Sequence, residues 1–87
     1  MPIAILWLTV AAVGTPPPAE ITALLDRREQ CAHWAGEEPY DRDRAAQIAS
    51  AVRRLRCGAI GREEDTLRRR HARNPAALKL LDAEPGD

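Results

Sequence analysis

Near its start the chain holds an apolar run without any charged residue, and helix-like patterning follows it. The run covers residues 3–13, and three consecutive prolines come shortly after it. It is shorter than the roughly 20 apolar residues that a membrane-spanning helix needs, and it is typical of a secretory signal peptide. We therefore predict a signal peptide over residues 1–14, with cleavage after Gly14, and a Pro-rich linker over residues 15–19. Because no Lys or Arg precedes the run, a short membrane anchor and a cytosolic chain with a buried first helix stay open.

Beyond the prolines, apolar residues recur with the period of an amphipathic helix. The first helix is predicted over residues 19–35, with Pro18 at its first helical position and Gly36 as its end. Its apolar positions are Ile21, Leu24, Leu25, Cys31, Ala32 and Ala35.

A second helix is predicted over residues 41–57, with Asp41 as its N-cap and Gly58 as its end. A third helix, over residues 62–73, has little apolar surface beyond Leu67. The apolar face of the second helix consists of Ala45, Ile48, Ala49, Val52 and Leu55.

A fourth helix opens with the Asn-Pro pair at 74–75, which suits an N-cap and a first turn, and it is expected to bury Leu78 and Leu81. The chain contains no run of alternating β-branched residues that would predict a strand. The sequence therefore predicts an all-α bundle of three to four short helices over residues 20–84, followed by a disordered tail over residues 85–87.

After cleavage the chain would be short of bulky apolar residues. It would keep eleven Leu, Ile and Val and has no Phe, and a core this thin usually needs a covalent cross-link. An even number of cysteines in a short exported chain indicates a disulfide, here Cys31–Cys57. Closing this loop of about 26 residues stabilises the fold by about 3.5 kcal/mol in the chain-entropy model. Free thiols in a cytosolic chain and bridges between chains are the alternatives.

The disulfide restricts how the first two helices pack. In a tight hairpin Cys31 would face the region of Ala45, and Cys57 would lie about 18 Å further along the second helix. A disulfide requires Cα atoms within about 7 Å. We therefore predict that residues 36–40 run extended over about 17 Å, so that the two helices cross rather than form a tight hairpin.

The segment around the predicted connection is the main candidate for function. Loops are where binding residues concentrate, and an acidic loop suits a basic partner. In the alternative, structural reading, Trp34 and Tyr40 pack over the disulfide and Asp41 only caps a helix. The candidate binding surface consists of His33, Trp34, Glu37, Glu38, Tyr40 and Asp41.

Metal chemistry and catalysis have weak support. His33 and Glu37 are four residues apart and suit a metal or small-ligand carrier, but a zinc site uses three or four ligands. The carboxylates of the connection lack the buried setting that a catalytic acid requires, and Ser50 lies in no nucleophile motif. We predict no enzymatic activity, no metal and no cofactor.

Arginine dominates the basic residues, and residues 42–73 hold ten Arg against four acids. Some of these arginines could form a basic face that binds phosphate. Alternatively their role is structural, because Glu64–Arg68 and Asp65–Arg69 have the spacing of helical ion pairs. The chain has a net charge of zero and no aromatic stacking platform, so we predict no nucleic-acid partner. The arginines of the possible face are Arg53, Arg54, Arg56, Arg68, Arg69, Arg70 and Arg73.

The string C-A-H-W-A-G-E-E-P-Y-D, with a second cysteine at 57, resembles small exported bacterial proteins with the pattern C-x-H-W-x-G-E-x-P-Y-D. The resemblance covers about residues 21–81 and implies a fold and a compartment, with no activity attached. The chain is also faintly similar to LprI-type lysozyme-inhibitor domains, which are small, exported, helical and cysteine-bonded. That similarity implies a basic hydrolase as partner. We therefore expect a periplasmic or secreted module of the bacterial envelope that binds a protein or has a structural role.

Overall fold

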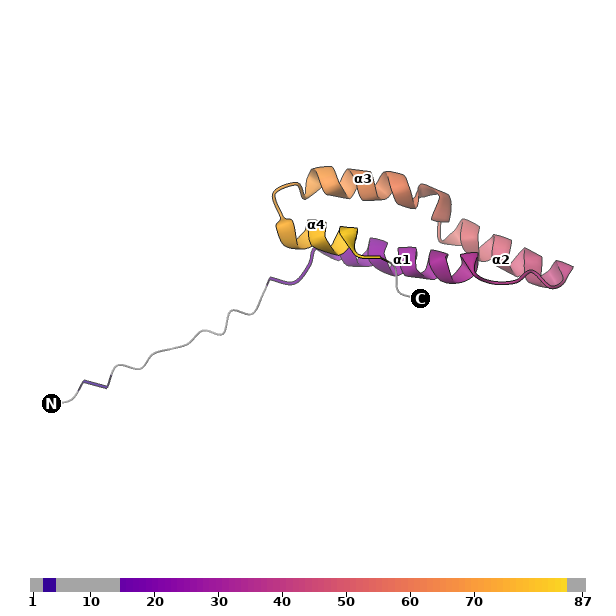
Figure 1. Cartoon of the computed structure of the whole chain (residues 1–87), viewed down its shortest axis with the longest axis horizontal. Helices are drawn as coiled ribbons and strands as arrows, with labels where there is room; N and C mark the ends of the chain where they lie inside the picture. Colours follow the sequence, from indigo (N-terminus) through magenta and orange to yellow (C-terminus); the bar gives the residue numbers. More distant parts are fainter. Residues whose placement is uncertain (1–2, 5–14, 85–87) are drawn as a thin grey trace.

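The computed structural model describes residues 3–4 and 15–84. Apart from residues 3 and 4, the predicted signal peptide lies outside the described residues, as does the predicted tail over 85–87. The described residues contain four α-helices and no strand, so the predicted all-α fold is confirmed (Figure 1). The elements are α1 (Ala19–Ala35), α2 (Arg42–Arg54), the 3₁₀ helix η1 (Cys57–Ala59), α3 (Ile60–Arg70) and α4 (Pro75–Asp82).

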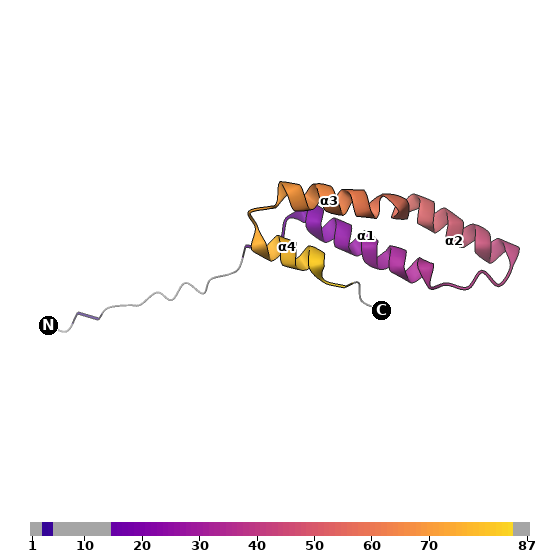
Figure 2. The same ribbon diagram turned by 45° about the horizontal axis from the view of Figure 1, so that its top comes forward.

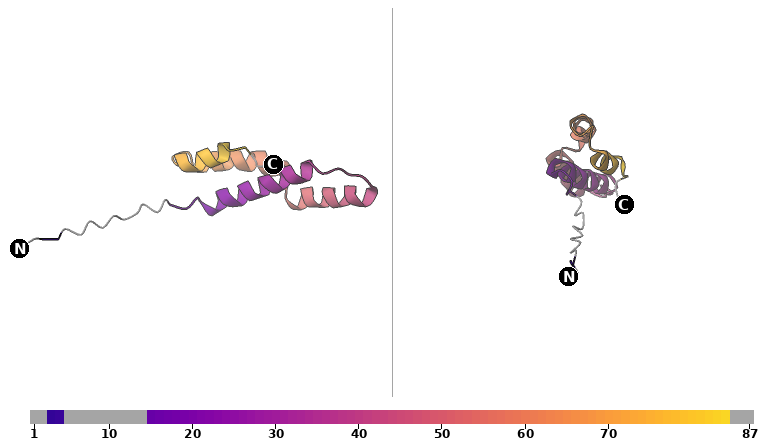
Figure 3. Two further views of the ribbon diagram at one scale, coloured as in Figure 1. Left: turned by 60° about the horizontal axis from the view of Figure 1, so that its bottom comes forward. Right: turned by 90° about the vertical axis from the view of Figure 1, so that its left-hand side faces the viewer.

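Helices α1, α3 and α4 pack around one small core, whereas α2 extends away from it. The view along the long axis in Figure 3 shows these three helices grouped together, and each contacts the other two. Among the described elements, α2 contacts α1 and η1 only, and Ala51 is its one buried residue. The core consists of Ile21, Leu24, Leu67, Ala77 and Leu81, with Leu25, Ile60 and Leu80 packed against it.

The core face of α4 differs in part from the prediction. Leu81 is buried as expected, but Leu78 is only half-buried, and Ala77 takes its place with 1% of its surface exposed. Ala77 and Leu81 are four residues apart and therefore share a face of the helix, from which Leu78 is rotated away.

Four helix ends follow the local signals in the sequence, the two ends of α1 and the starts of α2 and α4. α1 has the predicted bounds, with Gly36 at its C-cap and Pro18 at its N-cap, one position earlier than expected. The Oδ1 atom of Asp41 accepts a hydrogen bond of 2.7 Å from the backbone N–H of Arg44, which caps α2. Asn74 caps α4 in the same way.

The predicted end of α2 is wrong. The helix stops at Arg54, and the residue with left-handed backbone is Arg56, at φ 52°, so Gly58 does not end it. η1 then leads into α3, which begins and ends earlier than the predicted 62–73. The reason is tertiary, because the Leu55 and Arg56 carbonyls accept hydrogen bonds from a side chain of α1.

Cys31 and Cys57 form the predicted disulfide, with Cα atoms 5.6 Å apart. The connection carries the chain beyond the end of α1 in an extended course, and α2 then runs back toward α1 (Figure 2). As predicted, α1 and α2 do not form a tight hairpin. They are displaced from each other along their axes more than they cross (Figure 2). Because α2 starts beyond the end of α1, it is the C-terminal end of α2 that leads to Cys31.

Candidate functional site

The predicted binding residues lie at one end of the molecule, where α1 ends, the connection turns and α2 begins (Figure 2). The structure brings the side chains of His33, Trp34 and Glu37 together and leaves two others, Glu38 and Tyr40, exposed. Asp41 serves as the N-cap of α2.

Arg44 organises this end of the molecule, and the sequence reasoning missed it. Its Nη2 atom donates to Glu37 Oε2 at 2.9 Å, and its Nη1 atom donates to Gln47 Oε1 at 3.0 Å. The guanidinium carbon lies 5.3 Å from the centre of the Trp34 ring, within the range of a cation–π contact. His33 contacts the other Glu37 oxygen at 3.2 Å and meets the Trp34 ring edge-on, with centroids 5.7 Å apart. Glu37 is therefore balanced by Arg44 and is not a free acidic group.

Tyr40 does not pack as the structural reading expected. It is 77% exposed, so it does not cover the disulfide. Its backbone N–H donates to the Glu38 carbonyl at 3.0 Å, a local turn that leaves both side chains facing solvent. The connection therefore presents one exposed aromatic ring and one exposed carboxylate, with Pro39 between them in the chain.

A surface groove of about 430 Å³ lies beside Trp34. Trp34 itself is half-buried, and the rest of the lining comes from one face of α2. We call this feature the Trp34 groove. It is lined by Trp34, Ala46, Gln47, Ser50, Ala51 and Arg54.

The geometry at His33 and Glu37 bears on the metal-carrier hypothesis. The two side chains do approach each other, but the second oxygen of Glu37 is bonded to Arg44. Within the described part of the chain, no group of three or more potential metal ligands comes together. What this pair does in the structure is link α1 to the connection.

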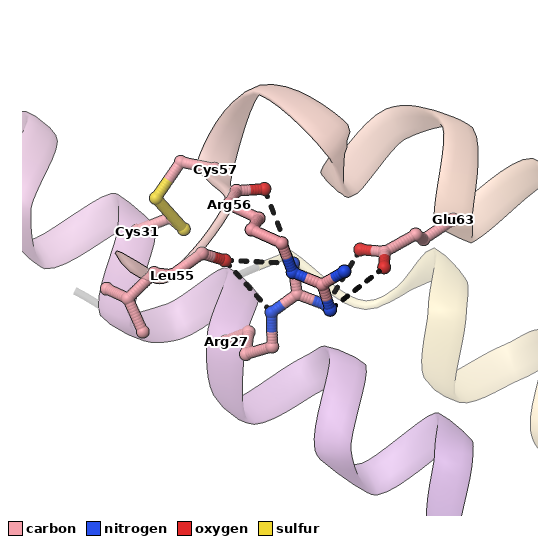
Figure 4. Close-up of a disulfide and its surroundings, with 6 residues drawn as sticks. All are labelled: Arg27, Cys31, Leu55, Arg56, Cys57 and Glu63. Carbon is pink, nitrogen blue, oxygen red and sulfur yellow. Dashed lines mark hydrogen bonds and ion pairs between the residues drawn. A yellow bond between two sulfur atoms is a disulfide. The ribbon is translucent and has the colours of Figure 1, made fainter. Parts of the chain in front are cut away.

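Two consecutive arginines of α1 act as tertiary clamps. Arg27 donates from Nε and Nη2 to the Leu55 carbonyl, at 3.0 and 2.8 Å, and from Nη1 to Glu63 at 2.7 Å (Figure 4). Arg27 and Cys31 are four residues apart and share a face of α1, so the guanidinium and the disulfide hold the same junction.

Arg28 repeats this scheme at the end of α4. Its Nη1 atom donates to Glu64 and to the Leu81 carbonyl, both at 2.9 Å, and Nη2 donates to the Ala83 carbonyl. Each clamp therefore binds free carbonyls at a helix C-terminus together with a glutamate of α3. Cations at helix C-termini are favourable because the carbonyls there carry partial negative charge.

The clamps change the expected ion pairs of α3. Glu64 pairs with Arg28 of α1, and Arg68 pairs with Asp82 of α4 at 2.6 Å, so both join different helices and the predicted Glu64–Arg68 pair does not form. Arg70 pairs with Glu20 of α1. Three arginines of the possible phosphate-binding face, Arg56, Arg68 and Arg70, are thus already engaged by carboxylates, Arg56 by Glu63 at 3.5 Å.

Glu20 lies at the start of α1, beside the end of α3. His71 lies 2.5 Å from its Oε1 atom, and Arg70 binds the other oxygen. The hydrogen bond to His71 and the charge of Arg70 lower the pKa of Glu20 below its ordinary value. This cluster ties the first turn of α1 to the end of α3.

Comparison of the chain with models of protein families, with curated proteins and with solved structures gives no match. None of the helices that the structure describes is both long and apolar enough to cross a membrane. The fold and the site together define a small all-helical, disulfide-bonded protein with an exposed aromatic residue and a tryptophan-lined groove at one end.

Proposed function

We propose that this chain is an exported binding module of the bacterial envelope, and that its partner is a protein that contacts the end formed by the connection and Trp34. The observation that carries the proposal is Tyr40, which is 77% exposed on a connection held by Arg44, Glu37 and the Asp41 cap. Exposed aromatic residues on a fixed backbone are typical anchors of protein interfaces.

The disulfide supports export, because such bonds persist in oxidising compartments and are rare in the cytosol. Intact mass spectrometry of the protein recovered from the envelope of its native host tests this point. We expect a chain cleaved after Gly14 that lacks the two thiol hydrogens. Recovery of the complete chain with two free thiols from the cytosol would contradict export.

The acidic character expected of the surface is reduced by the pairing of Glu37 with Arg44. The exposed Asp41 is used as the cap of α2, so the exposed carboxylates left nearby are Glu38 and Asp43, and neither forms an ion pair within residues 15–84. A basic hydrolase, as the similarity to LprI-type domains implies, would have to be recognised by these two groups. We therefore place the main anchor at Tyr40.

A photo-crosslinking amino acid placed at position 40 tests the surface in the native host. We expect a covalent adduct with one envelope protein from position 40, and none from the same amino acid placed at position 79, which is exposed on α4. The captured protein is then purified, and its affinity for the wild type and for Tyr40→Ala is measured. Equal adducts from both positions, or equal affinity for both chains, would refute the proposal.

A further inference from the structure

The Trp34 groove has the composition of a binding site. The Trp34 indole and the Ala46 methyl group provide apolar surface over the buried Ala51, while Gln47, Ser50 and Arg54 provide groups that form hydrogen bonds. It is a shallow groove, open to solvent, with a volume of about 430 Å³. An occupant therefore needs an apolar part for the indole and a polar part for the α2 side.

The indole is positioned before anything binds. Arg44 lies over the ring at 5.3 Å, and Glu37 and Gln47 hold the Arg44 guanidinium in place. His33 packs edge-on against the same indole. A preorganised aromatic surface lowers the entropy cost of binding, and Trp and Arg are the residue types most enriched among energetically dominant interface residues.

The charge at the groove identifies the occupant. Arg44 is neutralised by Glu37, whereas Arg54 forms no ion pair within residues 15–84. The nearest acid on the same face of α2 is Asp43, which lies about 16 Å away along the helix axis. The neighbouring Arg53 adds further positive charge. The Arg54 end of the groove is therefore complementary to a carboxylate.

We propose that the Trp34 groove binds an acidic peptide segment of the partner protein. An apolar side chain of the segment lies on the Trp34 indole and the exposed Ala46 methyl group, and a carboxylate accepts hydrogen bonds from the Arg54 guanidinium. This inference rests on the proposed function, because it names the chemistry of the partner at the end of the molecule that the function uses. It adds a basic, apolar subsite beside the exposed Tyr40.

Fluorescence titration of the complete, disulfide-bonded chain tests the groove. Trp7 is the only other tryptophan, so a Trp7→Phe background makes Trp34 the sole reporter. The probes are the acetylated and amidated peptide Glu-Glu-Leu-Leu-Glu-Glu and its analogue Gln-Gln-Leu-Leu-Gln-Gln. We expect the acidic peptide to change the Trp34 emission and the Gln analogue to bind about tenfold more weakly, because charge-assisted hydrogen bonds are the stronger ones.

Matched variants assign the effect to Arg54. Arg54→Gln is expected to weaken binding of the acidic peptide about tenfold, whereas Arg53→Gln, one residue away and outside the groove lining, changes it about twofold or less. Circular dichroism confirms that both variants are folded. A large loss in Arg54→Gln should be accompanied by a weaker dependence of binding on salt.

Three results would overturn the inference. The first is that the Gln analogue binds as well as the acidic peptide, and the second is that Arg54→Gln binds the peptide like the wild type. The third is that glucuronic acid binds in an Arg54-dependent way while the peptide does not. The last result would make the groove a sugar-acid site. These failures are distinct from failure of the proposed function, because crosslinking from position 40 reports a partner whether or not the groove takes part.

Discussion

The substitution Arg27→Gln removes the guanidinium that joins α1 to the junction between α2 and α3. Arg27 makes four hydrogen bonds, two to the Leu55 carbonyl, one to the Arg56 carbonyl and one to Glu63. A glutamine side chain is shorter and uncharged and has a single amide group. Most of these bonds are therefore lost, and the Leu55 and Arg56 carbonyls lose a cationic donor.

The size of the effect follows from the charge and burial of these groups. A hydrogen bond to an ionised group contributes about 1.5–3 kcal/mol net, but several bonds from one guanidinium do not add fully. The side chains of Arg27 and Glu63 are 21% and 32% exposed, so water replaces part of what is lost. Glu63 also keeps Arg56 at 3.5 Å. We expect Arg27→Gln to lower the free energy of unfolding by about 2–3 kcal/mol.

Urea unfolding followed by far-UV circular dichroism measures this difference. Both proteins keep the disulfide, so the cross-link restricts the two unfolded chains equally and the change reports the clamp. The control is Arg62→Gln, because Arg62 is exposed on α3 and forms no ion pair within residues 15–84. That control should stay within about 0.5 kcal/mol of the wild type. If Arg27→Gln loses no more than the control, the clamp does not stabilise the junction.

Three further predictions test the other contacts. Arg28→Gln should raise the hydrogen-exchange rates of the α4 amides about tenfold or more and leave those of α2 unchanged, and a uniform change would contradict a local clamp. The pKa of Glu20 is lowered in the folded state, so its contribution to folding stability is present above its ordinary pKa and is lost as the pH falls. In acid titrations, Glu20→Gln should therefore lose less stability between about pH 5 and 3 than the wild type does. Asp41→Ala should cost about 1 kcal/mol in urea unfolding, and no cost would show that the cap is dispensable.

The candidate site shows how far local reasoning reaches. The exposed connection and the Asp41 cap follow from residue types that start helices and interrupt them, so the sequence predicts both. The pairing of Glu37 with Arg44 was not predicted, because it depends on how the first turn of α2 is oriented against the end of α1. The sequence left open whether Tyr40 is exposed, as the binding hypothesis expects, or packs over the disulfide, because an aromatic residue in a loop gives no local signal of whether a neighbouring surface covers it.

By itself the sequence determined the all-α class, the bounds of α1, the Asp41 and Asn74 caps and the Cys31–Cys57 bond. Each depends on short-range periodicity, on a side chain that bonds its own helix end, or on the presence of only two cysteines. The tertiary structure decided where α2 ends, which residue of α4 enters the core and which acids the arginines bind. Those outcomes depend on partners far apart in the chain, as when Arg27 binds the carbonyls of Leu55 and Arg56 and thereby ends α2 without a glycine.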